Sequence, residues 1–244
     1  MHFHFEEGEV LLINKPLTWT SFDIINRFRF FLKKQLGIKK IKVGHAGTLD
    51  PLADGLLIVC TGRFTKRIEE FQGLEKEYTG TFHLGATTPS YDLEHEVDHM
   101  YETSHITSEM IYEATIQFTG DILQVPPVFS AIKIAGKRAY KFARSEKELE
   151  LDARPVNIRE FEITRIALPE IDFRVCCSKG TYIRSLARDF GEALGSGAHL
   201  TALRRTRIGE FQLENAFNLD DLMADITKES GEKYSPDKTG EDVG

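Results

Sequence analysis

The sequence predicts an α+β fold, because strand patterns and helix patterns are mixed along the chain. The run Leu56–Cys60 is short, apolar and partly β-branched, and glycines lie on either side of it, as is typical of a buried strand. From Tyr78 to Leu84 apolar and polar residues alternate, which predicts a strand with one buried face. Apolar residues recur at helical spacing from Ile183 to Leu194, and Gly195 provides a stop.

Length and composition are sufficient for a large hydrophobic core. The chain has 244 residues, of which 41% are hydrophobic and 17 are phenylalanine, enough for one large domain or one domain with an appendage. The amino end has no signal-peptide layout, and no apolar run reaches membrane-spanning length, so we expect no membrane association. The three cysteines have no C-x-x-C spacing, which argues against a disulfide framework or a zinc site and favours the cytoplasm.

The charge is distributed unevenly along the chain. Residues 214–244 contain nine acidic residues and three lysines, a net charge of −6, so the first 213 residues carry only −1 of the total of −7. The total charge therefore does not exclude a nucleic-acid partner, because the local field of a groove decides what it attracts. We expect the polar end from about Lys228 to be disordered.

The first third of the chain predicts a strand followed by a capped helix. Val10–Ile13 is a strand candidate, and Thr20 with Asp23 has the form of a helix-capping box. The helix should end near Gly37, with its apolar stripe formed by Phe22, Ile25, Phe28 and Leu32. Five lysines follow in this region, and such a cluster is more often a solvated face than a binding site; they are Lys33, Lys34, Lys39, Lys40 and Lys42.

The later segments add further strands and helices. Residues 91–104 are acidic and predict an exposed loop, and residues 108–118 predict a helix. Residues 130–144 predict a hairpin that turns near Gly136 and continues into a short helix. Beyond it, residues 154–166 are β-rich, and residues 173–177 predict a strand.

The polar stretch before the buried strand is a candidate site. Asp50 precedes Pro51, whose ring restricts the preceding backbone to extended conformations and so holds the carboxylate on a stiff chain. Asp-Pro and Asp-Gly are also ordinary turn dipeptides, and we interpret Asp54 as a turn residue. A metal site formed by His45, Asp50 and Asp54 is weakly supported, since nothing nearby completes a ligand set. No Gly-Lys-Ser/Thr follows the glycines, which excludes a phosphate loop.

Three further features allow both a functional and a structural interpretation. Residues 130–144 interleave five cations with Tyr140 and Phe142, which suits RNA binding but also an amphipathic helix with a basic face. Tyr78 begins a strand, where it either borders a cleft or packs in the core. Arg184 lies at the edge of the apolar stripe of its helix, where it either snorkels to solvent or reaches a carboxylate.

Taken together, these residues resemble the TruB-type tRNA pseudouridine synthases. The run Gly44-His-Ala-Gly-Thr-Leu-Asp50-Pro-Leu-Ala-Asp-Gly55 is similar to the catalytic motif of that family. The resemblance covers roughly residues 9–212 in the family's order, through Lys15-Pro16 with Thr20-Ser21, Lys76-Glu77-Tyr78, residues 126–144, Ser178–Arg184 and Gly197–Arg205.

This resemblance implies a fold, a reaction and a domain arrangement. The fold would be a mixed, mostly antiparallel sheet flanked by helices, with an RNA-gripping thumb at about residues 125–150. The catalytic domain would span residues 1–227, with an acidic tail over residues 228–244. The activity would be isomerisation of uridine to pseudouridine in the T-loop of tRNA, at position 55, after the base has flipped out.

The resemblance also implies roles for individual residues. Asp50 matches the catalytic aspartate, Arg184 the arginine paired with it, and Tyr78 the tyrosine against the target base. His45 matches a histidine that holds the flipped geometry, and Tyr182 and Leu203 match pocket residues. The residues expected to bind RNA are the cations Lys15, Arg63, Lys66, Lys133, Lys137, Arg138, Lys141, Arg204 and Arg205. Which chemical route Asp50 takes stays open.

The family resemblance also sets expectations about partners. We expect the T-arm of tRNA as partner, no cofactor, no metal, and a monomer that needs no protein partner. Two departures limit the resemblance: Thr18 stands where the family usually has glycine, and we expect no room for the C-terminal RNA-binding PUA domain of many members. The alternatives are a non-catalytic tRNA-folding chaperone and a synthase for another RNA.

Overall fold

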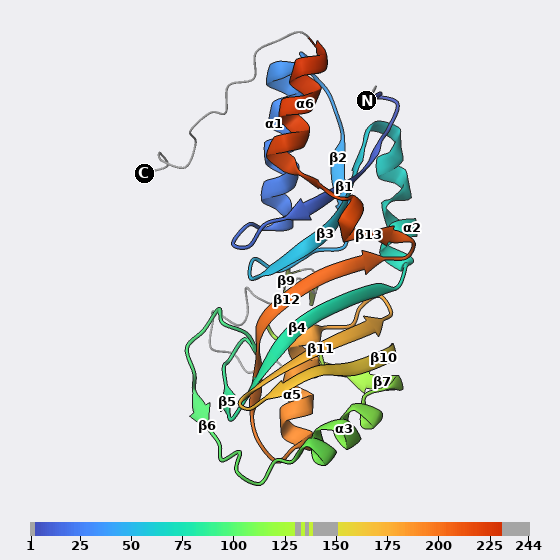
Figure 1. Cartoon of the computed structure of the whole chain (residues 1–244). Helices are drawn as coiled ribbons and strands as arrows, with labels where there is room; N and C mark the ends of the chain where they lie inside the picture. Colours follow the sequence, from blue (N-terminus) through green and yellow to red (C-terminus); the bar gives the residue numbers. More distant parts are fainter. Residues whose placement is uncertain (1–2, 130–132, 135–136, 139–150, 231–244) are drawn as a thin grey trace. The chain divides into compact units, whose positions relative to one another are not determined.

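The computed structural model describes residues 3–129, 133–134, 137–138 and 151–230 (Figure 1). It divides into two compact units, Met1–Gln72 with Phe211–Gly244, and Gly73–Glu210. We call these the N-terminal unit and the second unit. The helix predicted after the hairpin and the tail beyond residue 230 lie outside the described residues. Among the residues described, no helix is long and apolar enough to cross a membrane.

The sheet of the N-terminal unit is built around the predicted buried strand. This strand, β3 (Ala53–Thr61), pairs antiparallel with β1 (Val10–Lys15) and with β2 (Val43–Ala46). A short strand, β14 (Phe217–Asn218), runs parallel to β1 and brings the end of the described chain back to its start. Leu56–Cys60 are fully buried, as their apolar run predicts.

Two helices, α1 (Ser21–Gln35) and α6 (Leu219–Ser230), lie side by side in this unit (Figure 1). The predicted capping box of α1 is present: the Thr20 side chain accepts from the Asp23 N–H, and the Asp23 carboxylate accepts from the Thr20 N–H. The core between helices and sheet contains Phe28 and Leu32 of α1 with Met223 and Ile226 of α6. Burial of such side chains contributes roughly 1.5–3 kcal/mol each. After β3 come the 3₁₀ helix η1 (Gly62–Arg67) and α2 (Ile68–Gly73).

The sheet of the second unit is entirely antiparallel. Its strands lie in the order β12 (Ala198–Ile208), β4 (Lys76–Leu84), β11 (Glu170–Cys177), β10 (Arg154–Ala167) and β7 (Gly120–Gln124). The register follows the predicted alternation, since Phe82 of β4 lies opposite Ile171 of β11. Two small antiparallel pairs accompany the sheet: β5 (Ala86–Thr87) with β6 (His99–Met100), and β8 (Lys133–Ile134) with β9 (Lys137–Arg138). The second pair is the predicted hairpin.

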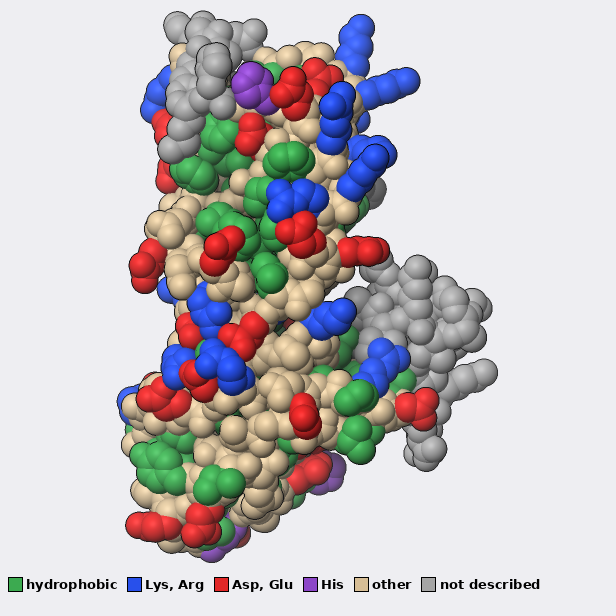
Figure 2. All heavy atoms as spheres, turned by 90° about the vertical axis from the view of Figure 1, so that its right-hand side faces the viewer, with side chains coloured by type: hydrophobic (Ala, Val, Ile, Leu, Met, Phe, Trp, Pro, Cys, Tyr) green, Lys and Arg blue, Asp and Glu red, His purple; other side chains and the backbone are tan. Residues whose placement is uncertain are grey.

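The two faces of this sheet differ in chemistry. One face is apolar and is covered by α5 (Ile183–Ala193) and α3 (Ser108–Gln117), with Phe82, Phe161 and Phe190 in ring contact. The other face carries interleaved arginines and carboxylates (Figure 2). There Glu75 accepts hydrogen bonds from Arg159 at 2.7 Å and from Arg207 at 2.8 Å, and the first of these bonds chiefly lowers the pKa of Glu75 to about 2.

Four sequence expectations were wrong in detail. Residues 43–46 form a strand rather than part of the polar loop, and Asp54 lies in β3 rather than in a turn. Phe22 is exposed, whereas Phe31, which was not part of the predicted stripe, is buried in the core. The expected disorder from Lys228 was wrong for its first residues, because α6, a helix that was not predicted, extends to Ser230.

Candidate active site

The loop between β2 and β3 carries Asp50 and is fixed at its backbone. Leu49, the preceding residue, is buried, and its N–H donates to the Ser21 hydroxyl at 2.8 Å. The same hydroxyl donates to the Leu49 carbonyl at 3.2 Å. Ser21 is the first residue of α1, so the capped helix start fixes the loop. The Asp50 side chain is half-buried.

The residue after Asp50 is held from the other direction. The Pro51 carbonyl accepts from the Thr18 N–H at 2.8 Å, and the Ala53 N–H donates to the Asp50 carbonyl at 3.1 Å, which closes a turn. The backbone is therefore anchored on both sides of Asp50. Such anchoring suits a group that must meet one atom of a substrate, because a small displacement of a reacting group costs much of the rate.

Thr18 stands where the family that the sequence resembles usually has glycine, and the backbone of the turn explains that preference. Its φ is 69°, in the left-handed region that glycine adopts without steric cost, so a preference for glycine there has a physical basis. Lys15 stabilises the turn because its ammonium donates to the Pro16 carbonyl at 2.8 Å and to the Trp19 carbonyl at 2.6 Å. Lys15 is fully buried. Its position therefore supports a structural role rather than the predicted contact with a phosphate.

His45 and Cys60 show what this region can offer a metal ion. His45 lies on β2 opposite Val59 and is half-buried. Cys60 is fully buried, and burial raises the pKa of its thiol to about 11, so the thiolate that binds metals is disfavoured at neutral pH. Among the described residues, no group of three or more His, Cys, Asp and Glu side chains has the geometry of a metal site.

The second unit holds Tyr78 on the apolar face of its sheet. Tyr78 is on β4, opposite Val175 of β11 and Arg205 of β12, and only 9% of its surface is exposed. Lys76 shares that face two residues earlier and is buried with its ammonium on the Leu74 carbonyl at 2.6 Å. Burial, with nearby Arg205 as the next cause, lowers the pKa of Lys76 to about 8. Tyr78 is therefore a buried aromatic residue whose neighbours in the sheet include Lys76 and Arg205.

Arg184 is buried at the start of α5 and is held by three groups. Its Nη2 donates to the Phe129 carbonyl at 2.9 Å, and its Nη1 donates to the Ser90 carbonyl at 3.3 Å. Its Nε lies 3.6 Å from a carboxylate oxygen of Asp92. The side chains of Arg184 and Asp92 are 5% and 7% exposed, so this is a buried ion pair.

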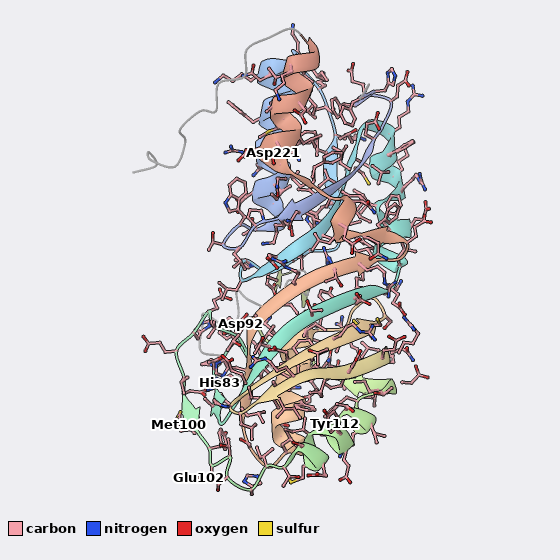
Figure 3. The ribbon with its side chains drawn as sticks, in the orientation of Figure 1. His83, Asp92, Met100, Glu102, Tyr112 and Asp221 are labelled. Carbon is pink, nitrogen blue, oxygen red and sulfur yellow. The ribbon has the colours of Figure 1, made fainter. Side chains whose placement is uncertain are left out.

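Asp92 is itself fixed by the loop between β5 and β6 (Figure 3). Its second carboxylate oxygen accepts from the Glu94 N–H at 3.0 Å, and its carbonyl accepts from the Thr88 hydroxyl at 2.7 Å. The loop is tied to the sheet because the Leu200 N–H donates to the Tyr91 carbonyl at 2.9 Å. Asp92 therefore orients Arg184 from a rigid position.

The segment that leads into the predicted thumb is bound to the start of α5, the helix that carries Arg184. The Gln124 amide donates to the Tyr182 carbonyl at 3.1 Å and accepts from the Tyr182 N–H at 2.8 Å. One residue on, the Val125 carbonyl accepts from the Ser185 hydroxyl at 2.8 Å. With the bond from Arg184 to Phe129, the beginning of α5 holds residues 124–129. The start of α5 therefore positions both Arg184 and the residues that lead into the predicted thumb.

The predicted site residues are divided between the two units. Asp50 and His45 belong to the N-terminal unit, and Tyr78, Tyr182, Arg184 and Leu203 belong to the second. Within the units the structure groups Asp50 with Thr18 and Ser21, and Arg184 with Asp92. The pairing of Asp50 with Arg184 stays a prediction.

The cations predicted to bind RNA differ in exposure. Arg63 and Lys66 on η1 and Arg204 on β12 are exposed, whereas Arg205 is buried like Lys15. Because Arg205 is only 1% exposed, its guanidinium has little surface at which a phosphate could bind. Lys133, Lys137 and Arg138 lie in the β8–β9 hairpin. Lys141 lies outside the described residues.

Comparison with known proteins places this arrangement in a family. A family model described as "TruB family pseudouridylate synthase (N terminal domain)" matches residues 33–183, and one described as "tRNA pseudouridylate synthase B C-terminal domain" matches residues 184–237. The chain belongs to the TruB family of pseudouridylate synthases. Its core fold is therefore that of an isomerase family, as the motif around Asp50 predicted.

Individual relatives of this TruB-family protein agree over most of their length. The chain is 60% identical over 214 residues to tRNA pseudouridine synthase B of Flavobacterium johnsoniae, covering 87% of this chain and 93% of the relative. It is 45% identical over 224 residues to tRNA pseudouridine synthase B of Chlorobaculum tepidum, covering 91% and 92%. Among solved structures, a chain of a Cbf5–Nop10–Gar1 complex matches with a TM-score of 0.69 and 30% identity, over 94% of this chain and 58% of that one.

Sequence reasoning missed Asp92, Ser21 and Gln124 in this TruB-family protein. Asp92 lies in a segment whose acidic composition predicted an exposed loop, and nothing local distinguishes it from its exposed neighbours. Ser21 follows the helix cap, where a serine is unremarkable. A detectable signal existed for Gln124, because an amide just before the Pro126-Pro127 break is well placed to satisfy backbone groups.

Proposed function

We propose that this protein isomerises uridine to pseudouridine in the T-loop of tRNA, at position 55, with Asp50 as the catalytic residue. The observation that carries the proposal is the fixed backbone on both sides of Asp50, within a motif of a pseudouridylate synthase family. Relatives that share up to 60% of their residues with this chain are named tRNA pseudouridine synthase B. A binding protein would not need such a stiff carboxylate.

The reaction rearranges one bond and leaves the atoms unchanged. The bond from N1 of uracil to C1′ of the ribose breaks, and a bond from C5 to C1′ forms. The proton on C5 is lost and N1 gains one, so substrate and product are isomers. No electrons are exchanged with a partner and no group is donated, and the reaction therefore requires no redox cofactor.

Each proposed residue has a part in this rearrangement. Uridine must leave its stack before a side chain reaches it, at a cost of a few kcal/mol that stacking and phosphate contacts offset. Tyr78 would stack on the base, and His45 would support the flipped geometry. Asp50 acts only while ionised, and burial beside a base disfavours the charged form of a carboxyl group. We therefore propose that Arg184 lies close enough to Asp50 to keep it charged.

The held position of Arg184 suits this task. A guanidinium has five N–H donors in a planar fork, enough to bind the carbonyls of Ser90 and Phe129 and to face more than one carboxylate. Asp92 compensates the buried charge in the second unit and keeps the guanidinium oriented. On this proposal Arg184 serves two carboxylates, one that positions it and one that reacts.

The decisive experiment compares two aspartates of the same motif. We expect Asp50→Asn to lower tritium release from tRNA labelled with 5-tritiated uridine by roughly 10³-fold or more, because the reacting carboxylate is removed. Asp54→Asn is the matched control on adjacent β3, and it should retain most of the activity. Equal activity of the two variants would remove Asp50 from the mechanism.

Substrate position and assembly are tested separately. A tRNA with cytidine in place of uridine 55 should release no tritium from that site, and mapping pseudouridine in cells that lack the protein should show its loss at position 55. We further propose that the protein acts on the T-arm as a monomer in the cytoplasm. Sedimentation with and without tRNA tests the monomer, and a dimer-dependent activity would contradict it.

A further inference from the structure

A stretch of the N-terminal unit carries strong positive charge within an acidic chain. From Ile24 to Leu49 the sequence contains seven lysines and arginines and no acidic residue, although the whole chain has a net charge of −7. Two of the seven are engaged: Arg27 pairs with Asp220 at 2.7 Å, and Arg29 donates to the Val43 carbonyl at 3.0 Å. The other five are exposed lysines; they are Lys33, Lys34, Lys39, Lys40 and Lys42.

The segment that carries three of these lysines is packed rather than loose. After α1 the chain turns at Gly37, whose φ is 64°, and runs to β2. Leu36, Ile38 and Ile41 pack against the core of the N-terminal unit. Because the apolar side chains face inward, Lys39, Lys40 and Lys42 are displayed outward on a fixed backbone.

Further cations and an aromatic ring adjoin these lysines. The Lys42 carbonyl accepts from the Gly62 N–H at 2.9 Å, which places the segment beside η1 with its exposed Arg63 and Lys66. On the last turns of α1, Phe30 is 57% exposed, and the Lys34 ammonium lies 5.1 Å from the centre of its ring. Lysine and arginine side chains gather on the surface of this unit in Figure 2. We call Phe30 and the five lysines the lysine surface.

Four of the five lysines of this surface have no carboxylate partner among the described residues. Lys33, Lys39, Lys40 and Lys42 form no ion pair with any residue that the structure describes. Like charges gathered on one surface oppose the compact state, and phosphate groups would relieve that repulsion. Cations interleaved with an exposed aromatic side chain are the elements of a nucleic-acid surface, since the charges bind phosphates and the ring stacks on a base.

The lysine surface is separate from the Asp50 loop. Both belong to the N-terminal unit, and β3 runs between the Asp50 turn and Gly62, which bonds to Lys42. The strand extends from Ala53 to Thr61, so its ends are about 26 Å apart at roughly 3.3 Å per residue. A phosphate on the lysine surface therefore belongs to a part of the RNA other than the target nucleotide.

We propose that the lysine surface is a second RNA-binding surface, which holds phosphates of the tRNA at a distance from the target uridine. This inference rests on tRNA being the substrate. It assigns a function to the lysines that sequence reasoning treated as a solvated face. It also gives the N-terminal unit RNA contacts that do not depend on the predicted thumb.

The test is a change of charge at three lysines. The variant Lys39→Gln, Lys40→Gln and Lys42→Gln should bind tRNA at least about tenfold more weakly at physiological salt. The slope of log K against log salt should fall in magnitude by about 2 to 3, since each lost phosphate contact removes about 0.9. Binding is measured by fluorescence anisotropy in an Asp50→Asn background, so that turnover does not affect it.

Two controls separate charge from folding. The matching variant with arginine at the same three positions keeps the charge and should bind like the parent, which excludes a packing effect. As single changes, Lys40→Gln should weaken binding, whereas Lys228→Gln should not, because Lys228 is an exposed lysine of the same unit that pairs with Asp225. Thermal melting confirms that each variant is folded.

The outcomes distinguish this surface from the proposed reaction. Unchanged affinity and an unchanged salt slope in the glutamine variant would overturn the lysine surface. Weaker binding with no tritium release by the wild-type protein would contradict the proposed isomerisation and leave the surface intact. Weaker binding of the arginine variant equal to that of the glutamine variant would show that packing, not charge, is involved.

Discussion

The backbone around Asp50 and the guanidinium of Arg184 are held by different kinds of interaction. In the N-terminal unit, neutral hydrogen bonds from Ser21 and Thr18 fix the main chain on both sides of Asp50. In the second unit, Arg184 depends on a buried carboxylate and two carbonyls. Neutral bonds are little affected by pH or salt, whereas a buried charge is costly once its partner is lost. Substitutions in the two units should therefore change stability and activity in different ways.

The largest effect should follow from removing the carboxylate that faces Arg184. Asp92→Asn leaves a buried guanidinium without its counter-charge, which should lower the free energy of unfolding by roughly 3–5 kcal/mol. Tritium release should fall by on the order of 100-fold, because the arginine is no longer oriented. Urea unfolding and single-turnover assays measure the two effects.

Asp98→Asn is the matched control for this change. Asp98 is an exposed aspartate of the same loop and bonds to the Thr87 hydroxyl. The free energy of unfolding of this variant should lie within about 0.5–1.5 kcal/mol of the wild-type value. If Asp92→Asn were as mild, the buried pair would not position Arg184.

An intermediate effect is expected where the Asp50 loop meets α1. Ser21→Ala removes the hydroxyl that binds the backbone of Leu49 and should cost about 1–3 kcal/mol, because a buried N–H is left unsatisfied. Activity should fall by roughly tenfold through kcat, because the reacting group shifts. This loss should be the same at low and high salt, because the lost hydrogen bond is neutral.

The adjacent Thr20→Ala separates loop fixation from helix stability. It removes the N-cap of α1 and should cost about 1 kcal/mol without touching the loop. Its kcat should stay near the wild-type value. Equal kcat values for Ser21→Ala and Thr20→Ala would show that the Ser21 bond serves the helix alone.

The smallest effect concerns the charged face of the second sheet. Because Arg159 lowers the pKa of Glu75 to about 2, the stabilisation from Glu75 is complete above its ordinary pKa of 4.5 and is lost as the pH falls toward 2. Solvent screening limits the contribution to about 1 kcal/mol. In Glu75→Gln the acid-dependent loss of stability between pH 5 and pH 2 should be smaller by that amount.

The control for this change is Glu210→Gln, an exposed glutamate of the same unit. Its unfolding free energy should follow the wild-type pH dependence. Chemical unfolding at a series of pH values measures both variants. An identical pH dependence in Glu75→Gln and wild type would contradict a contribution from the pair with Arg159.

Local patterns in the sequence were sufficient for most of the fold. The capping box at Thr20 and the alternation around Tyr78 specify helix and strand directly, because each depends on neighbouring residues. The α6 helix was missed although Leu219, Leu222, Met223 and Ile226 are buried at helical spacing. Its many acidic residues concealed that stripe, and its partner α1 lies far away in the sequence.

The site was predictable as a motif but not as a set of contacts. Asp50 stood out because a stiff aspartate preceded a buried strand. The pairing of Arg184 with Asp92 joins residues 92 apart, and the burial of Lys15 depends on the turn that it stabilises. Long-range contacts of this kind leave no local periodicity, so only the folded chain reveals them.

The burial of all three cysteines has a practical consequence for spectroscopy. Cys60, Cys176 and Cys177 are buried, and burial raises the thiol pKa of Cys60 to about 11 and that of Cys177 to about 12. Maleimides react with the thiolate, so the native thiols should stay unlabelled at neutral pH. A single cysteine introduced on the surface could therefore carry a fluorophore in the otherwise wild-type chain, and it would report tRNA docking in real time.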